Sequence, residues 1–151
     1  MNYKHKQTGY LIIAVIVLVA ILFGFILMQV QDELTNAMPV IMVLILIILG
    51  SFTSLKVMID EKHLKINFGY GIFRKQFALN EIASAKIVRN HWYYGWGIHV
   101  WFWPKMWIYA ISGLDAIEVV MKDGNIYRVG TDDITGLEQA ILQGISKEDN
   151  K

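Results

Sequence analysis

A run of twenty-one uncharged residues, Tyr10 to Val30, constrains this chain more than any other feature. Only Gln29 in this run is strongly polar. At ~1.5 Å rise per residue, a helix of this length spans about 30 Å, the thickness of a bilayer's hydrocarbon core. A soluble helix keeps one polar face, whereas this run is apolar on all sides. It predicts a membrane-spanning helix over residues 10–30.

A cleaved signal peptide is the alternative for an apolar run near the N-terminus. Lys4 and Lys6 supply the basic start, but the apolar stretch exceeds the usual ~7–15 residues. The tripeptide at residues 35–37, Thr-Asn-Ala, is a poor cleavage site. We therefore interpret the run as a retained anchor.

A second uncharged run covers the nineteen residues 37–55. Pro39 lies where a first-turn proline is tolerated, because its missing N–H would have no helical partner there. The most apolar part is shorter than the whole run, so a crossing needs residues 50–55 as well. The two runs predict a transmembrane hairpin, with residues 31–36 as an extracytoplasmic loop.

The basic residues beside the two runs predict the orientation of the hairpin. These are Lys4 and Lys6 before the first run, and Lys56, Lys62 and Lys65 after the second. Residues 31–36 contain no Lys or Arg. Positive flanks stay in the cytoplasm, so we expect a multi-pass protein of the cell (plasma) membrane with both termini cytoplasmic, residues 1–9 forming the N-terminal cytoplasmic segment.

Residues 56–145 read as a separate domain of about seven strands and one helix. Apolar and polar residues alternate at 56–60, 63–68 and 83–90, as in half-buried strands. Further strands are predicted at 72–79, 98–103, 106–111, 116–122 and 126–129, the last two joined by an Asp-Gly-Asn turn. Absence of βαβ alternation favours an antiparallel sheet or barrel.

The hydrophobic period changes to that of a helix after residue 130. Ile134, Leu137, Ala140 and Ile141 share one helical face over residues 133–143. Thr131 or Asp132 can cap its N-terminus, and residues 146–151 read as a polar tail. The predicted fold class is an α + β membrane protein.

Four segments of the domain resemble a known group of proteins. They are residues 93–98 (YYGWGI), 107–113 (WIYAISG), 116–124 (AIEVVMKDG) and 127–133 (YRVGTDD). With the hairpin-then-domain layout, they resemble small bacterial membrane proteins with a pleckstrin-homology-like (PH-like) domain. The resemblance implies a PH-like antiparallel β-barrel closed by one C-terminal helix. It implies no general biochemical function, because that group has none.

The sequence lacks the motifs of common enzymes. It has no cysteine, no Gly-x-Ser-x-Gly elbow, no phosphate-binding loop and no His-Glu-x-x-His. His63, His91 and His99 lack metal-ligand spacing, and helix capping explains Asp132 and Asp133. We therefore expect no catalytic residue, no cofactor and no metal. The net charge of +1 argues against a nucleic-acid partner.

All five tryptophans lie between Trp92 and Trp107, in a tract with nine aromatic residues among eighteen. Such rings suit surfaces that are half dry and half wet. We hypothesise that Trp101, Trp103 and Trp107, with Lys105, contact the lipid headgroup layer or a partner. The alternative is that these rings pack in or over the barrel.

The start of this tract, Tyr94-Gly95-Trp96-Gly97, has a different character. Two glycines around a tryptophan indicate a bend with backbone conformations closed to other residues. The segment is either a corner of the fold or a loop that binds a partner.

Four basic residues are candidates for contact with anionic lipid: Lys62, Lys65, Arg74 and Lys75. Each basic residue near a membrane surface contributes ~1 kcal/mol of attraction. The alternative is a solvated strand face, because Asp60 and Glu61 dilute the positive charge.

Two classes of function remain open from the sequence. The first is a non-catalytic membrane-tethered module at the cytoplasmic membrane face that recruits a protein partner or assembles with copies of itself. The second is an accessory or regulatory subunit of a membrane transporter or envelope-stress complex. The expected partners are the lipid bilayer, an unidentified membrane or cytoplasmic protein, and a second copy of the chain.

Overall fold

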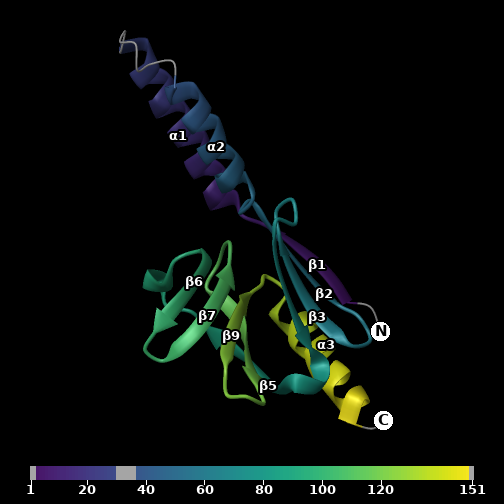
Figure 1. The fold of residues 1–151 in the computed structure, drawn as a ribbon. Helices are drawn as coiled ribbons and strands as arrows, with labels where there is room; N and C mark the ends of the chain where they lie inside the picture. The colour runs from purple at the N-terminus through teal and green to yellow at the C-terminus, as the bar shows by residue number, and fades with distance from the viewer. Residues whose placement is uncertain (1–2, 30–36, 150–151) are drawn as a thin grey trace.

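The computed structural model of the chain describes residues 3–29 and 37–149 (Figure 1). Its strands and helices, in chain order, are β1 (Tyr3–Thr8), α1 (Tyr10–Gln29), α2 (Met38–Gly50), β2 (Ser54–Ile59), β3 (His63–Phe68), β4 (Phe73–Ala78), β5 (Ile82–Arg89), β6 (Gly97–Phe102), β7 (Lys105–Ala110), β8 (Asp115–Met121), β9 (Ile126–Gly130) and α3 (Ile134–Asp149). Two short 3-10 turns, η2 (Leu79–Glu81) and η3 (Trp92–Tyr94), precede β5 and β6. The predicted loop at 31–36 lies outside the described residues. Helix α3 continues through most of the predicted polar tail.

The strands form two sheets. The first has the order β1-β2-β3-β4 and is antiparallel throughout. The second has the order β5-β8-β9-β7-β6, and its β7–β9 pair is parallel. Figure 1 shows α3 beside the first sheet, while β6 and β7 lie on the other side of the molecule.

The predicted closed PH-like barrel is wrong, because the two sheets have four and five strands and neither closes. Among the described residues, no strand pairing joins one sheet to the other. Strand β4 ends the first sheet, and its Lys75 pairs with the buried Ile66, so this lysine points toward the interior side. There its ammonium group lies 5.5 Å from the ring of Phe77 and 5.6 Å from that of Tyr127. An inward-pointing charge blocks further strand addition at an edge.

One main core lies between the sheets and α3. Strands β2 and β3 alternate buried and half-buried positions, as their sequence alternation predicts. Leu64, Ile66 and Phe68 of β3 meet Ile117 of β8 and Leu137 of α3 in this core. The second sheet carries a smaller core on its other face, built on Met106, Ile108 and Ala110.

Residues 3–8, predicted to belong to a cytoplasmic segment, form strand β1. They pair with β2 over the full length of both strands, from Tyr3↔Ile59 to Thr8↔Ser54. The Tyr3 hydroxyl donates to Asp133 at 2.9 Å, which ties β1 to the start of α3. Burial and this carboxylate raise the pKa of Tyr3. The chain therefore leaves the sheet through α1 and returns through α2 to the neighbouring strand.

The prediction of two membrane-spanning helices is wrong. Among the described helices, only α1 is long and apolar enough to cross a bilayer, by length and composition. Helix α2 has 13 residues, which gives it a length of ~20 Å. It ends because the polar segment after Gly50 turns into β2, with the Thr53 hydroxyl donating to the Gly50 carbonyl at 2.8 Å. The multi-pass localisation with two cytoplasmic termini depended on both spans and is not supported.

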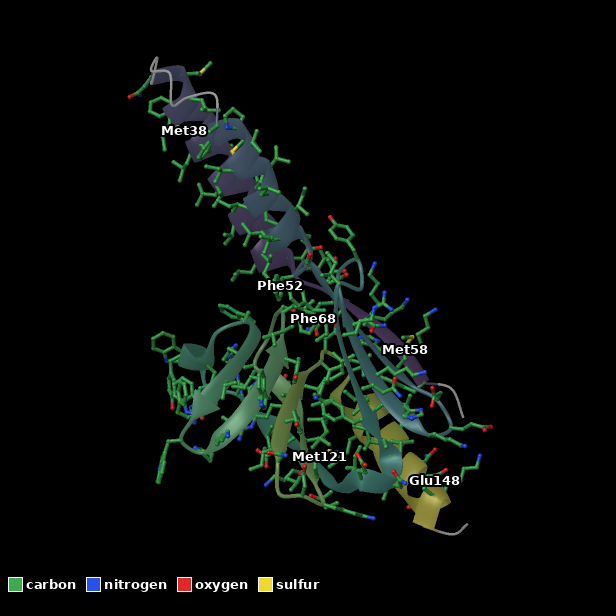
Figure 2. The ribbon with its side chains drawn as sticks, viewed as in Figure 1. Met38, Phe52, Met58, Phe68, Met121 and Glu148 are labelled. Carbon is green, nitrogen blue, oxygen red and sulfur yellow. The ribbon has the colours of Figure 1, made fainter. Side chains whose placement is uncertain are left out.

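The helical hairpin projects from the domain with its apolar side chains outward. No residue of α1 is buried, and Figure 2 shows side chains pointing away from both helices on all sides. Where the helices meet the sheets, Phe52 and Phe68 lie together, with ring centroids 5.7 Å apart. An apolar surface this large on a protein signals contact with a membrane or another protein.

Gly69 fixes the turn that brings β3 against the end of α2, and its replacement is expected to destabilise the protein strongly. Its φ is +47°, and a Cβ there would lie 2.3 Å from the Ser51 carbonyl oxygen. Gly69→Ala is expected to lower the free energy of unfolding by about 2 kcal/mol or more. The loss has two causes: alanine is strained in a left-handed backbone conformation, and its Cβ clashes with the Ser51 carbonyl oxygen. Gly71→Ala is the matched control, because its φ is also positive but its nearest neighbour is the Arg74 side chain at 3.4 Å. Denaturant unfolding of the full chain in detergent, followed by tryptophan fluorescence, measures both. Equal losses would contradict this account of the turn.

Candidate membrane-proximal site

An open cavity of ≈ 560 Å³ lies where the helical hairpin meets the second sheet. The hairpin contributes Leu11, Ile12, Val15 and Leu49 to its lining. The domain contributes Phe52, Tyr94, Trp96, Gly97, Ile98 and His99. Cavities that hold small ligands have this size, ~300–1,000 Å³, and are mostly apolar with a few polar groups. We call it the junction cavity.

The bend before β6 forms the domain side of the junction cavity. Gly95 and Gly97 have φ values of 71° and 114°, which glycine adopts without strain. The Trp96 indole N–H donates to the Gly113 carbonyl at 3.2 Å, which holds its ring at the cavity wall. The predicted segment Tyr94–Gly97 is thus a corner of the fold, and it also lines a cavity beside α1.

His99 contributes the one imidazole group of the junction cavity. Its Nε2 atom is buried and has no hydrogen-bond partner among the described residues. Burial lowers the pKa of His99 below its ordinary value, against the weaker opposing effect of a hydrogen bond with the Tyr94 backbone. The ring is therefore neutral at pH 7, with one donor and one acceptor nitrogen.

A second membrane-proximal feature is the turn between β3 and β4. Tyr70 and Ile72 are 72% and 62% exposed there, and Phe73 stacks on Phe52 with centroids 5.2 Å apart. The Tyr70 hydroxyl lies 2.9 Å from where a Cβ would sit on Gly50, at the end of α2. Large apolar side chains thus extend outward beside the base of the hairpin.

The outer face of the first sheet carries a group of basic side chains. Strand alternation and pairing place five side chains there: Lys4, Lys6, Lys56, Lys65 and Arg74. Lys6 lies directly opposite Lys56, and like charges in that position destabilise a sheet. This pair is two residues, or ~7 Å, from the end of β1, the end from which the chain passes into α1. We call these five residues the cationic face.

The four basic residues selected from the sequence do not form one cluster. Lys65 is on the cationic face but bonds Asp60 at 2.6 Å, and Arg74 donates to the Gly71 carbonyl. Lys62 lies in the turn at the far end of the sheet, and Lys75 faces the interior side. The sequence analysis used Lys4, Lys6 and Lys56 only as basic flanks of the two apolar runs, and it did not place residues 3–8 in a strand beside Lys56.

The aromatic hairpin of β6 and β7 separates the rings that the sequence grouped together. Trp101 lies opposite Met106 and Trp107 opposite Val100, so Trp101 and Trp107 lie on different faces of the sheet. Trp101 packs on Tyr94 with centroids 4.6 Å apart, in the smaller core. Trp107 stacks on Tyr109 at 6.5 Å and is 39% exposed.

Phe102 and Trp103 form the exposed tip of this hairpin. They are 83% and 90% exposed, and Lys105 follows them across the turn. Strand β6 begins at the junction cavity with Gly97 and runs to this tip, a distance of ~17 Å. In Figure 1 the turn after β6 lies on the side of the domain away from the helical hairpin. This position places Trp103 at a distance from the base of α1.

A buried ion-pair network crosses the second sheet on the same face as His99. Glu118 accepts two bonds from Arg128, at 2.9 and 2.8 Å, and pairs with Lys86 at 2.9 Å. Arg128 also donates to Asn90 at 3.2 Å. Burial alone would raise the pKa of Glu118, but the hydrogen bonds from Lys86 and Arg128 outweigh it and lower the pKa. This network fixes the strands that carry the aromatic hairpin.

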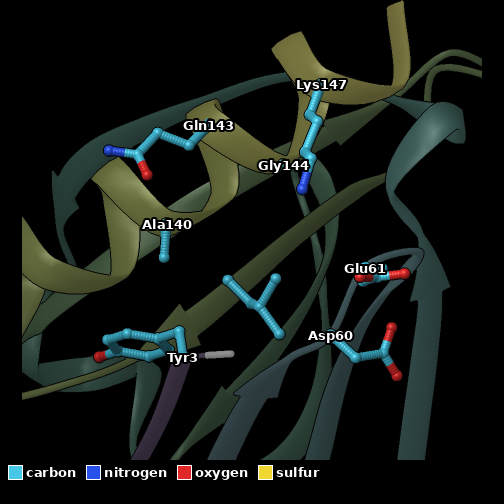
Figure 3. Close-up of a pocket in the computed structure, with 8 residues that line it drawn as sticks. Tyr3, Asp60, Glu61, Ala140, Gln143, Gly144 and Lys147 are labelled. Carbon is cyan, nitrogen blue, oxygen red and sulfur yellow. The ribbon is translucent and has the colours of Figure 1, made fainter. Parts of the chain in front are cut away.

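A smaller cleft lies between the β2–β3 turn and α3 (Figure 3). Gln143 and Lys147 project from α3, and Asp60 and Glu61 lie across from them. Its volume is ≈ 170 Å³, below the range typical of ligand pockets. Asp60 also accepts bonds from Lys65 and from the backbone N–H groups of Lys62 and His63, which lower its pKa. The acidic side of this cleft is therefore part of a turn.

The histidines and carboxylates do not assemble a metal site: no group of three or more such side chains has suitable geometry among the described residues. Asp133 caps α3, accepting from the Gly136 N–H at 3.1 Å, and Asp132 pairs with His5. The prediction that helix capping explains both carboxylates holds for Asp133 alone, and the predicted cap, Thr131 or Asp132, is wrong.

Comparison of the chain with protein-family models, with curated proteins and with solved structures gave no match. The resemblance to PH-like proteins therefore stays a prediction, without its closed barrel.

Proposed function

We propose that this protein is a non-catalytic, membrane-anchored binding module. The helical hairpin, with α1 as its long apolar helix, enters the bilayer and returns through the same membrane face, because β1 before it and β2 after it pair in one sheet. The domain lies against that face. The exposed tip of the β6–β7 hairpin, on the side away from the helices, binds a protein partner. Each part of this proposal depends on a separate feature of the described residues.

The observation that carries the proposal is the direct connection between the apolar hairpin and the first sheet. Gly9 alone separates β1 from α1, and its N–H donates to the Thr53 carbonyl at 2.8 Å. On the return, only residues 51–53 separate α2 from β2. With α1 in lipid, these connections keep the domain within a few Å of the headgroups. The domain then presents a fixed surface to the membrane.

Charge and exposed apolar groups support this placement. Lys6 and Lys56 lie opposite each other ~7 Å from the end of β1, the end from which the chain passes into α1. Anionic headgroups would relieve the repulsion between these two paired lysines. On the β3–β4 turn, Tyr70 and Ile72 are exposed at the same end of the sheet. Aromatic and apolar side chains favour this interfacial layer.

The exposed tip supports a protein partner. Phe102 and Trp103 extend into solvent with almost their whole surface, which costs solubility unless another molecule covers them. Tryptophan and phenylalanine are enriched at the centre of protein interfaces, and tryptophan is among the residues that contribute most binding energy. A tip ~17 Å from the junction cavity is placed for a partner outside the bilayer.

Substitution at the tip tests the partner-binding role. In the full chain purified in mild detergent, Phe102→Ser together with Trp103→Ser is expected to weaken a stoichiometric complex by at least about thirtyfold, because anchor residues contribute ~2 kcal/mol or more. Trp92→Ser is the matched control, since Trp92 is 75% exposed but outside the tip. The measurement is the copurified ratio of partner, or of a second copy, to the chain.

Three outcomes of that experiment separate the alternatives. Loss of the complex in the tip variant alone supports the proposal. Equal loss with Trp92→Ser would contradict a specific tip. A fixed membrane-protein partner that both variants retain would favour an accessory subunit held through the helices.

A further inference from the structure

We propose that a row of side chains across the outer face of the first sheet binds the phosphate of an anionic phospholipid in the adjacent leaflet. The row consists of Lys6, Lys56, Asn67 and Arg74, one from each strand. We call these four residues the cross-strand row. Phosphatidylglycerol represents this class of lipid. This role rests on the proposed function, because the domain meets headgroups only while the helical hairpin holds it at a membrane.

The register of the first sheet places the members of the cross-strand row side by side. Lys6 pairs with Lys56, which pairs with Asn67 on its other side. Asn67 pairs in turn with Arg74. Directly opposed side chains point to the same face and neighbouring strands are ~4.8 Å apart, so three cations and one amide lie within ~14 Å. Figure 2 shows several side-chain nitrogen atoms near Met58, which shares this face with Lys56.

Most hydrogen-bond donors of the cross-strand row are free. Among the described residues, no carboxylate pairs with Lys6 or Lys56, although these two lysines lie directly opposite each other. Arg74 donates from Nε to the Gly71 carbonyl, which leaves its two terminal NH₂ groups for a ligand. Asn67 lies between Lys56 and Arg74, so its amide can donate to the same anion. A phosphate accepts from all these groups and relieves the repulsion between the lysines.

The surface around the cross-strand row favours an anionic lipid over a zwitterionic one. An open hollow of ≈ 330 Å³ over β3 and β4 has a lining of basic and neutral side chains: Lys65, Asn67, Arg74, Lys75 and Gln76. None of the four strands of the first sheet contains an Asp or Glu. The ammonium group of a phosphatidylcholine bound here would therefore meet cations and find no counterion on these strands. Phosphatidylglycerol has no ammonium group.

The position of the cross-strand row favours a lipid over a dissolved phosphate. Lys6 is two residues, or ~7 Å, from the end of β1, the end from which the chain passes into α1. Arg74, at the other end of the row, follows the turn that carries the exposed Tyr70 and Ile72. Figure 1 shows β1, β2 and β3 extending from the base of the helical hairpin. The bilayer that holds the hairpin also holds headgroups at this level, which raises their effective concentration.

Lipid retention by the full chain tests this role. The protein is reconstituted in nanodiscs with equal amounts of phosphatidylglycerol and phosphatidylcholine that have the same acyl chains, and is then released into mild detergent. Native mass spectrometry compares the amounts of chain that keep each lipid. Phosphatidylglycerol should exceed phosphatidylcholine by at least about tenfold, because each basic residue near an anionic surface contributes about fivefold.

Two double variants locate the preference on the protein. Lys6→Gln with Lys56→Gln should lower the ratio of the two lipids by about tenfold or more. Since glutamine removes a like-charge pair, this variant should unfold at no lower denaturant concentration than the unmodified chain. Lys122→Gln with Lys147→Gln is the matched control, because it removes the same charge from exposed positions outside the first sheet. The control should keep the preference.

The outcomes separate this role from the proposed function. Equal retention of the two lipids by the unmodified protein would overturn phosphate recognition, whether or not the variants fold. An equal loss of the preference in the control variant would assign it to overall charge and overturn the cross-strand row. Loss of the preference in millimolar glycerol 3-phosphate, at constant ionic strength, would assign the row to a soluble phosphate ester and overturn the lipid. All three results leave the anchor intact, whereas failure of the unmodified chain to float with vesicles would overturn the proposed function itself.

Discussion

Two lysines in the middle of α1, Leu18→Lys with Ile21→Lys, are expected to release the protein from vesicles. Both side chains point outward, being 56% and 64% exposed, so no neighbouring residue would compensate their charge. Each lysine at the centre of a membrane helix costs ~2.5–3.5 kcal/mol, about 5–7 kcal/mol for the pair. Flotation of reconstituted vesicles on a density gradient measures the effect. Most of the unmodified chain should float, and most of the variant should remain in the dense fractions.

Leu18→Ala with Ile21→Ala is the matched control for this experiment. Alanine shortens the same side chains without adding charge, so this variant should float with the unmodified protein. Tryptophan emission of the lysine variant checks that the sheets still fold. Flotation of the folded lysine variant at the unmodified level would show that α1 does not insert.

Removal of the Glu118 carboxylate is expected to produce the largest loss of folding stability. Glu118 is 7% exposed and holds Arg128, whose side chain is only 15% exposed. Glu118→Ala leaves this guanidinium buried without a counterion, and such losses amount to about 3–5 kcal/mol. Lys86→Ala should cost less than about 1 kcal/mol, because that partner is 63% exposed. Denaturant unfolding of the full chain in detergent provides both values, and equal losses would contradict a buried network.

Acid should weaken the same network. The folded-state pKa of Glu118 is lowered, so the unfolded chain binds its proton more readily. The contribution of Glu118 is therefore complete above the ordinary carboxyl pKa near 4.5 and is lost as pH falls through the lower folded value. The free energy of unfolding should fall as the pH is lowered from about 5 to about 3, the range in which carboxyl groups take up protons. Glu118→Gln should flatten that slope, whereas an unchanged slope would assign it to other carboxylates.

Local sequence patterns predicted most of the strands but not the edge strand of the first sheet. Alternation of apolar and polar residues identified β2 and β3, and the Asp-Gly-Asn turn helped to identify β8 and β9. Both signals lie within a few residues of sequence. Alternation missed β1, where it is weak: Tyr3 is its one large apolar residue, with His5 and Gln7 on the same face. Pairing with β2 and the bond to Asp133 form this strand, and both depend on distant residues.

The arrangement of the candidate site depends even more on pairing between residues that are far apart in the sequence. The sequence found the aromatic tract and the glycine bend, but a shift of one residue in hairpin register moves every ring to the other face. The actual register puts Trp101 inside and leaves Phe102 exposed. No local sequence pattern links Leu11 with His99, so the sequence did not indicate the junction cavity. The directly opposed Lys6 and Lys56 were equally hidden until β1 was known.

The most direct test of the membrane anchor uses the absence of cysteine from the chain. A single cysteine at Leu18 can carry a nitroxide spin label in the full chain reconstituted in vesicles, with Lys122, in the turn after β8, as the aqueous control site. Collision rates with oxygen, which concentrates in lipid, and with a water-soluble nickel chelate give the surroundings of each label. Oxygen-dominated collisions are expected at position 18 and nickel-dominated collisions at position 122. Nickel access at position 18 equal to that at position 122 would contradict membrane insertion of α1.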